Sequence, residues 1–156
     1  MTYPKSTVPL IPFLLCCALL VGCAATRQAS PEQRKPIVEI VEHSYEQGVA
    51  FDKAKRWAAQ AFNSANDVIQ EEDDERGTLV MKGIHRVNRA GVGIPVSYAL
   101  TLDVRTEKMR LTFRPGEATN GSGLTEAGAE QLKELYFGSL KPEVVNAVES
   151  EDSFFN

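Results

Sequence analysis

The sequence contains few of the residues from which metal sites are built. All three cysteines, Cys16, Cys17 and Cys23, lie near the start of the chain, and there are only two histidines, His43 and His85. A structural zinc site needs about four cysteine, histidine or carboxylate ligands. We therefore expect no metal site, and we expect both histidines to be ordinary strand residues.

Motifs that mark common enzymes are also missing. Gly91-Val92-Gly93 lacks the later glycine and lysine of a phosphate-binding loop. No serine stands in a Gly-x-Ser-x-Gly arrangement, which would place a nucleophile on a sharp strand-to-helix turn. These absences predict no catalytic residues and no cofactor, and they favour a protein that is not an enzyme.

The chain has neither an excess of basic residues nor a long apolar run. Its 17 lysines and arginines against 21 aspartates and glutamates give a net charge of −4, which provides no electrostatic reason to bind nucleic acid. The longest apolar stretch, Leu10 to Val21, is interrupted by Pro12. At about a dozen residues it is too short for a membrane-spanning helix, which needs roughly 20.

A basic residue, Lys5, followed by this short apolar run is typical of a secretory signal. The run closes with Leu20-Val21-Gly22-Cys23, which resembles the lipobox of bacterial lipoproteins. The resemblance implies a signal peptide at residues 1–22, cleavage between Gly22 and Cys23, and attachment of lipid to the Cys23 sulfur. The alternative is a plain signal peptide in which Cys23 has no role.

Processing at this site would change the chemistry of the chain. Cys16 and Cys17 would leave with the signal and lipid would block Cys23, so no disulfide is expected. The net charge would become −5, because Lys5 is the one charged residue removed. Ala24, rather than aspartate, follows the cysteine; in lipoproteins of the enterobacterial type this favours the outer membrane, with the domain facing the periplasm.

Residues 23–36 are small, polar and interrupted by prolines, and they predict a lipidated cysteine followed by a flexible tether. Fully extended, such a tether would reach about 45 Å. Three scattered basic residues within it, Arg27, Arg34 and Lys35, are a weak indication of contact with lipid headgroups. Residues 37–150 then predict a single folded domain, and residues 151–156 a short tail.

Alternating and β-branched residues predict five strands in this domain, at residues 37–43, 68–72, 78–86, 96–105 and 109–114. Residues 88–93 and 115–123 are expected to be loops. Between the first two strands, residues 50–65 have helical periodicity, with Trp57 and Phe62 on the apolar face and Lys53 and Lys55 on the opposite side.

The end of the domain predicts two helices. Thr125 is a suitable N-cap for a helix that extends to Phe137, and Gly138 is expected to end it. Pro142 would then stand in the first turn of the last helix. Together these elements predict an α+β fold, in which an antiparallel sheet of about five strands carries helices on one face.

Several of these stretches resemble a bacterial family of unknown function whose fold is like that of the TATA-binding protein. The resemblance lies in the tryptophan-bearing helix, in Val68-Ile69-Gln70-Glu71-Glu72-Asp73, in Gly77 to Gly83, and in the paired strands that follow. It implies the order β-α-β-β-β-β-α and no catalytic residues. It does not imply DNA binding, because a fold alone does not specify function.

Helices that cover one face of a sheet leave the other face open to solvent or to a partner. Alternation places one set of side chains on that face, and we name it as the candidate interaction site: Thr101, Asp103, Arg105, Arg110, Thr112 and Arg114. The simpler interpretation is a solvated sheet surface.

The acidic run Glu71 to Glu75 has two interpretations. It could attract calcium, but it lacks the spaced aspartates and glycine of a calcium loop. A solvated hairpin that resists pairing between sheet edges is the preferred interpretation.

The sequence thus favours an outer-membrane lipoprotein with a non-catalytic binding or assembly-accessory domain in the periplasm. The membrane, through the lipid on Cys23, is its first expected partner, and an envelope protein, peptidoglycan or a second copy could be the next. The alternative is a small-ligand carrier or enzyme with a pocket between the sheet and the helices.

Overall fold

The computed structural model of the chain describes residues 27–62, 68–89 and 91–150. The predicted signal peptide at residues 1–22, the predicted lipidation site at Cys23 and the predicted tail at residues 151–156 lie outside the described residues.

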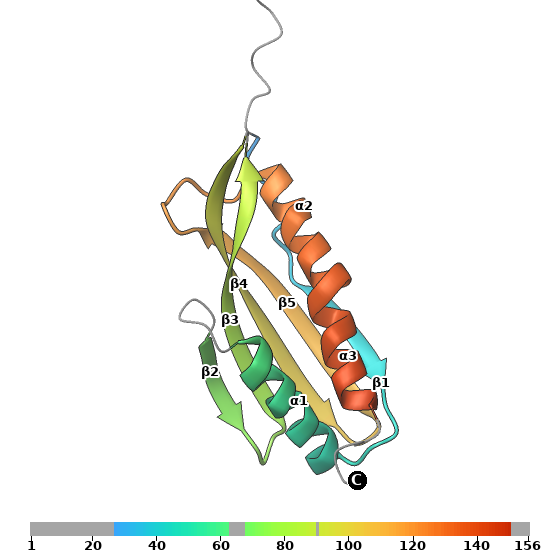
Figure 1. Cartoon of the computed structure of the whole chain (residues 1–156). Coiled ribbons are helices and arrows are strands. Elements are labelled where there is room, and N and C mark those ends of the chain that lie inside the picture. The colour runs from blue at the N-terminus through green and yellow to red at the C-terminus, as the bar shows by residue number, and fades with distance from the viewer. Residues whose placement is uncertain (1–26, 63–67, 90, 151–156) are drawn as a thin grey trace, which may run out of the picture.

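One antiparallel sheet of five strands forms the first layer of the domain (Figure 1). Its spatial order is β1-β5-β4-β3-β2, so the first strand of the chain pairs with the last. The strands are β1 (Ile37–Glu42), β2 (Val68–Asp73), β3 (Thr78–Arg89), β4 (Val92–Arg105) and β5 (Lys108–Ala118). Alternating buried residues mark the three middle strands, β3, β4 and β5.

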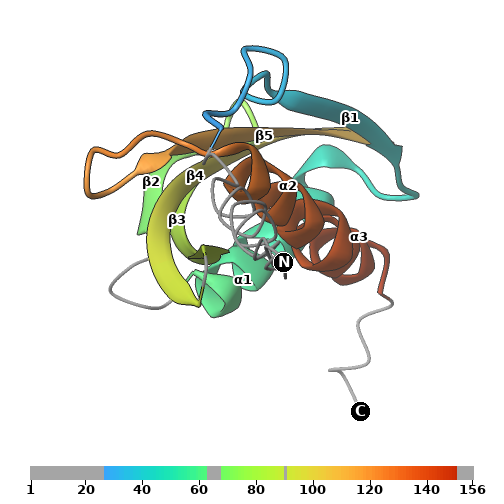
Figure 2. The ribbon, with the colours of Figure 1, turned by 90° about the horizontal axis from the view of Figure 1, so that it is seen from above.

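The helices form the second layer, and the sheet curves around them (Figure 2). Helix α1 (Gln47–Ala61) lies across one end of the sheet, and a long helical rod runs beside it. That rod consists of α2 (Glu126–Leu135), the π-helical segment η1 (Tyr136–Leu140) and α3 (Lys141–Glu149). The predicted α+β fold, with helices on one face of a five-stranded sheet, is confirmed.

Both predicted loops are partly strand: residues 88–89 and 92–93 belong to β3 and β4, and residues 115–118 belong to β5, whereas residues 119–123 are loop as expected. β3 and β4 pair up to Arg89 and Val92, with Gly91 in the turn at a φ of 81°. β5 continues past Pro115, because the register against β4 shifts between Val96 and Tyr98. A bulge of this kind accommodates a proline, which cannot donate to the ladder.

The C-terminal rod differs from the prediction at Gly138. Thr125 caps α2 as expected, accepting a hydrogen bond from the Gly128 amide at 3.2 Å. Gly138, however, does not end the helix, since it lies inside η1 and the chain continues directly into α3. A π-helical turn is wider than an α-helical turn because its hydrogen bonds join residues five apart. Burial of Tyr136 and Leu140 holds this wider turn of η1 against the sheet. Pro142 lies in the first turn of α3 as expected, but because η1 continues directly into α3 the proline removes one backbone donor from within the rod.

The core between the layers is a continuous series of aromatic rings. Trp57 contacts Phe62 at 5.7 Å between ring centroids, and Phe62 contacts Tyr98 at 6.3 Å. Tyr98, Phe113 and Tyr136 continue the series at 5.5 and 5.0 Å. Each such contact adds about 1 kcal/mol to the burial of apolar area.

Helix α1 departs from the prediction at Lys53. Its side chain is buried and not on the solvent side, with Nζ 3.9 Å from the centre of the Tyr45 ring. The same ammonium group donates a hydrogen bond to the Ser150 carbonyl after α3. Because a lysine can extend its apolar stem through the core to a polar partner, helical periodicity alone misplaces it. Residues 63–65, the predicted end of this helix, lie outside the described residues.

The predicted tether is shorter than expected, because residues 27–36, hereafter the N-terminal segment, lie against the domain. Ala29 is buried, and its amide donates to the Leu124 carbonyl at 2.8 Å. The Glu126 amide in turn donates to the Arg27 carbonyl at 3.0 Å. A few side-chain hydrogen bonds and one buried alanine fix this segment, and none of these has a periodic signature in the sequence.

Candidate functional site

The sheet face turned away from the helices, hereafter the outer face, carries every residue of the predicted interaction set. Strand pairing aligns Thr101 with Thr112, Asp103 with Arg110 and Arg105 with Lys108. Residues directly opposite each other in an antiparallel pair project from the same face of the sheet. Arg114, opposite Ala99, completes the set on this face. The structure therefore brings these residues together, whereas their role stays a prediction.

Asp103 is the centre of a hydrogen-bonded cluster on this face. Arg110 donates to its Oδ2 atom from both Nε and Nη2, at 3.0 and 2.7 Å. The Thr78 hydroxyl donates to its other oxygen at 3.1 Å. With its carboxylate satisfied from two neighbouring strands, Asp103 is largely neutralised as a binding group.

Three other basic side chains of the outer face have no such neutralisation. Among the residues that the structure describes, Lys82, Lys108 and Arg114 form no ion pair. All three are exposed. A chain with a net charge of −4 thus concentrates positive charge on the middle strands of its open face. Surface charge of this kind determines partner choice and association rate more than affinity.

Aliphatic side chains border this charged surface at the edge strand β1. Val38 and Ile40 are 56% and 69% exposed, and they stand opposite Thr112 and Arg110 in the register. Ile40 also lines a shallow hollow of about 310 Å³ together with charged outer-face residues, namely Asp103, Arg105, Lys108 and Arg110. The outer face therefore combines exposed aliphatic groups with basic groups beside a concavity.

The acidic turn between β2 and β3 is arranged as an ion-pair cluster. Lys55 on α1 contacts the Glu72 carboxylate at 2.5 Å and the Asp74 carboxylate at 3.1 Å. Hydrogen bonding to Glu72 and then to Asp74 raises the pKa of Lys55. In the described part of the chain, no three histidine, cysteine or carboxylate groups gather as a metal site requires.

The two histidines occupy different positions. His43, one residue past β1, is buried, and its Nδ1 accepts a hydrogen bond from the Tyr45 amide at 3.3 Å. Hollows of about 610 and 580 Å³ border it, lined mostly by surface groups. His85 lies within β3, opposite Val96. Among the described residues, no ionisable side chain is hydrogen-bonded to either imidazole, and the buried Nε2 of His43 has no partner there.

Sequence reasoning missed one partly buried polar contact at the edge of the core. Glu39 of β1 accepts hydrogen bonds from the Tyr136 hydroxyl and the Lys141 ammonium, both at 2.9 Å. Burial, and then the Glu39 carboxylate, raise the pKa of Tyr136 above its usual range. The one available signal was a glutamate at an inward position of β1, between Ile37 and Val41. The contact joins the edge strand to the helical rod and has a structural role.

The space between the layers bears on the alternative of an internal ligand pocket. Along the described residues, the aromatic series from Trp57 to Tyr136 lies in this space, with each ring in contact with the next. A hollow of about 210 Å³ lies instead at the rim, between the N-terminal segment and α2. Ligand pockets usually have volumes of roughly 300–1,000 Å³, so this hollow is smaller than most of them. Among the described residues, no helix is both long enough and apolar enough to cross a membrane.

Fold and outer face together define a two-layer α+β domain of the TBP-like class. Residues 39–115 match the family described as a domain of unknown function (DUF4468) with TBP-like fold. The resemblance expected from the sequence is thereby confirmed. No match to the sequence was found among curated proteins.

Two solved structures share this fold. A DUF4468 family protein from Bacteroides ovatus superposes with a TM-score of 0.56 at 11% identity, covering 81% of this chain and 92% of that protein. A TBP-like protein from Parabacteroides distasonis superposes with a TM-score of 0.59 at 10% identity, covering 78% of this chain and 96% of that protein. At these identities the similarity establishes the fold and does not extend to function.

Proposed function

We propose that the protein is a lipid-anchored, non-catalytic binding domain of the bacterial cell envelope, held at the outer membrane through Cys23 and facing the periplasm. The anchor is inferred from Leu20-Val21-Gly22-Cys23 and from Ala24 after it. The binding role is inferred from the outer face. The observation that carries it is the set of unpaired basic groups, Lys82, Lys108 and Arg114, on an otherwise acidic protein.

The partner that fits this surface is an envelope protein that presents an acidic segment with aliphatic side chains. Acidic groups would complement Lys82, Lys108 and Arg114, while aliphatic groups would cover Val38 and Ile40. Peptidoglycan also carries carboxylates, but it would leave the two aliphatic side chains uncovered. A protein partner is therefore favoured over a glycan.

Site-specific crosslinking in cells tests the binding role. A photo-crosslinking amino acid at Thr112, in the middle of the outer face, is compared with one at Glu134, exposed on the helical layer. We expect one discrete protein adduct from position 112 and none of that size from position 134. The combined change Lys82→Glu and Arg114→Glu should remove the adduct without lowering the amount of folded protein.

The other outcomes identify different functions. The same adducts from both positions, or an adduct that survives charge reversal, would contradict recognition by the outer face. An adduct of twice the protein's mass would identify a second copy as the occupant, and an adduct released by a muramidase would identify peptidoglycan.

The anchor is tested separately by Cys23→Ala. We expect the variant to remain uncleaved or to appear in the soluble fraction, whereas Cys16→Ala, as the matched control, should be processed and retained in the membrane. Normal membrane retention of the Cys23→Ala variant would contradict lipidation at this residue. Separation of inner from outer membranes by density then tests the contribution of Ala24.

A further inference from the structure

We propose that the domain stands on the membrane with its β3–β4 hairpin end down, where Arg27, Arg86 and Arg89 bind anionic phospholipid headgroups and Val92 contacts the lipid interface. This orientation rests on the proposed lipid anchor. The hairpin end consists of the β3–β4 turn, the loop before α2, the start of α2 and residue Arg27.

Hydrogen bonds fix the start of the described chain to this end of the molecule. The Gln28 side chain donates to the Ser122 carbonyl at 3.0 Å, and Gln28 forms a bridge with Thr125. The hairpin is joined to the same place, since the Gln131 side chain of α2 bonds both the amide and the carbonyl of Asn88, at 2.7 and 3.1 Å. The chain therefore enters the domain beside the hairpin tip (Figure 1).

The distance from the lipid to this entry point is short. Four residue steps separate Cys23 from Arg27, and four extended residues span at most about 14 Å. The 14 residues of β4 extend over about 45 Å. The connection is much shorter than the domain. The end at which the chain enters the domain therefore stays near the bilayer, and the opposite end cannot reach the bilayer.

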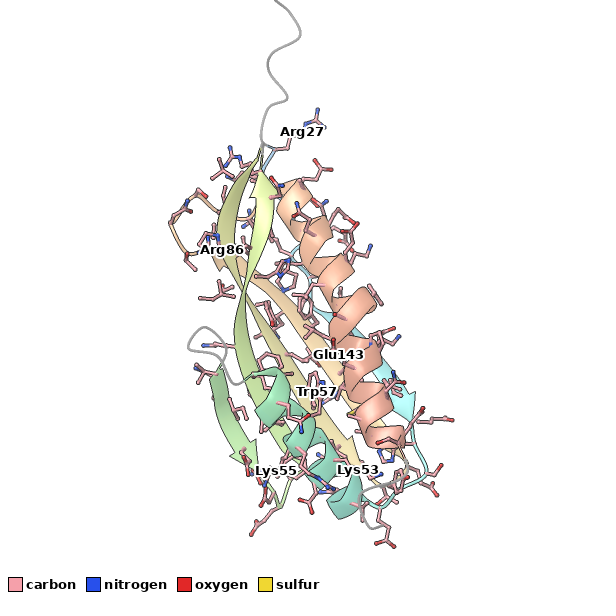
Figure 3. The ribbon with its side chains drawn as sticks, in the orientation of Figure 1. Arg27, Lys53, Lys55, Trp57, Arg86 and Glu143 are labelled. Carbon is pink, nitrogen blue, oxygen red and sulfur yellow. The ribbon has the colours of Figure 1, made fainter. Side chains whose placement is uncertain are left out.

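Charge is distributed along the same axis. From Arg76 to Leu102 the sequence contains no aspartate or glutamate, and this stretch forms the hairpin. Arg27 and Arg86 lie toward the hairpin end, whereas Lys55, which pairs with the acidic turn, lies toward the other (Figure 3). The end that the connection holds at the membrane is thus the basic one.

The acidic groups near the hairpin end do not cancel this charge. Glu117 pairs with Arg34 at 3.2 Å. Glu126 lies in the first turn of α2, where the positive end of the helix dipole, equivalent to about half a charge, offsets part of its charge. The acidic turn at the far end of β3 is about 40 Å away, far beyond the screening length of about 8 Å at physiological salt.

The hairpin tip also carries an apolar group suited to a lipid interface. Val92, the last register partner of β3, is 63% exposed and stands opposite Arg89. An exposed valine between arginines at a turn would gain contact with the interface while the arginines remain at the headgroups.

The test uses the lipidated protein, purified from membranes and reconstituted into vesicles. Once processed, the chain has no thiol besides the blocked Cys23, so a single introduced cysteine can be labelled with the fluorophore NBD. Val92→Cys reports the hairpin end, and Glu75→Cys, at the acidic turn, is the matched control. Vesicles of equal phosphatidylcholine and phosphatidylglycerol are compared with pure phosphatidylcholine, each with a headgroup spin-labelled quencher.

We expect the quencher to act on the label at position 92 and not on the label at position 75. The difference should be larger with phosphatidylglycerol and smaller at high salt. The double variant Arg86→Glu and Arg89→Glu should weaken the preference of the hairpin end for phosphatidylglycerol over phosphatidylcholine by at least about 25-fold. Each basic residue near an anionic surface contributes about five-fold to this preference.

Other results overturn the orientation. Equal quenching of both labels in a vesicle-bound protein would reject it while leaving the anchor intact. Two results together would reject both the anchor and the orientation. The first is an N-terminal peptide whose mass includes no lipid, and the second is a protein that does not float with vesicles. Quenching at position 92 that persists in pure phosphatidylcholine and in the double arginine variant would reject headgroup charge as its cause.

Discussion

The carboxylate of Glu39 accepts a hydrogen bond from the hydroxyl of Tyr136 at 2.9 Å, across the sheet-to-helix interface. Lys141 holds the second oxygen of the same carboxylate, so one edge-strand residue contacts both η1 and α3. Tyr136 is fully buried and its ring stacks on Phe113 at 5.0 Å. The polar contact therefore fixes where the helical rod lies on the sheet.

Removing the Tyr136 hydroxyl should destabilise the domain. Tyr136→Phe keeps the ring but leaves one Glu39 oxygen without its buried donor, which costs about 1–3 kcal/mol. Urea unfolding measures this loss. Tyr45→Phe is the control, because the Tyr45 hydroxyl has an exposed and long hydrogen bond of 3.4 Å, and it should change stability by no more than about 0.5 kcal/mol.

The raised pKa of Tyr136 also predicts a dependence on alkaline pH. The folded state retains the hydroxyl proton at a pH where the unfolded chain loses it. The stabilisation is therefore complete below the unfolded pKa of about 10 and declines above it, by up to about 1.4 kcal/mol per pH unit. The stability difference between the wild type and Tyr136→Phe should shrink above pH 10, as followed by urea midpoints. A constant difference would contradict this assignment.

Two glycine substitutions should have opposite effects. Gly138→Ala within η1 meets no atom within 4 Å and should stabilise the domain by about 0.5–1 kcal/mol, since alanine restricts the unfolded chain. Gly77→Ala should destabilise it by more than about 1 kcal/mol, because Gly77 has a φ of +58° and a methyl group would lie 2.6 Å from the Val104 carbonyl. Thermal unfolding of both variants gives the comparison, and a loss of stability in Gly138→Ala would show that η1 requires glycine.

The aromatic series predicts a graded response at Trp57. Trp57→Ala should cost about 3–5 kcal/mol, because it leaves a cavity beside Phe62. Trp57→Phe should cost less than about 2 kcal/mol, since the buried indole Nε1 has no hydrogen-bond partner among the described residues. Circular dichroism in urea follows both, as the chain has one tryptophan and its fluorescence is lost in either variant. A cost below about 1 kcal/mol for Trp57→Ala would contradict its role in the packed core.

Detaching the N-terminal segment should leave the rest of the domain folded. Ala29→Asp places a carboxylate at a buried position against Leu124, and we expect amide exchange at residues 27–36 to accelerate at least ten-fold, about 1.4 kcal/mol. Protection in β4 should stay unchanged. Glu32→Gln, on the exposed side of the segment, is the control. Loss of protection in β4 would show instead that this segment is part of the cooperative core.

Alternation along the strands predicted both the sheet and its open face. When one side of a strand is buried, every second residue must point to the opposite side. Thr101, Thr112 and Arg114 could therefore be assigned to one surface before any pairing was known. The hairpin around Gly91 could not be assigned as strand, since its residues are mostly exposed and cross-strand pairing is a non-local property. Gly138 showed a different limit, because burial of Tyr136 and Leu140 outweighs the local tendency of glycine to end a helix.

The pairing of β1 with β5 has a consequence for how the chain folds. Ile37 pairs with Phe113 and Glu42 with Lys108, so the first strand is made about seventy residues before its partner exists. Until β5 has been synthesised, the backbone groups of β1 have no strand partner on this side, and an unpaired strand that carries Val38 and Ile40 is prone to aggregation. The β1 edge of the sheet can therefore close only after nearly the whole sheet sequence has been made, which is the kind of non-local pairing that slows folding.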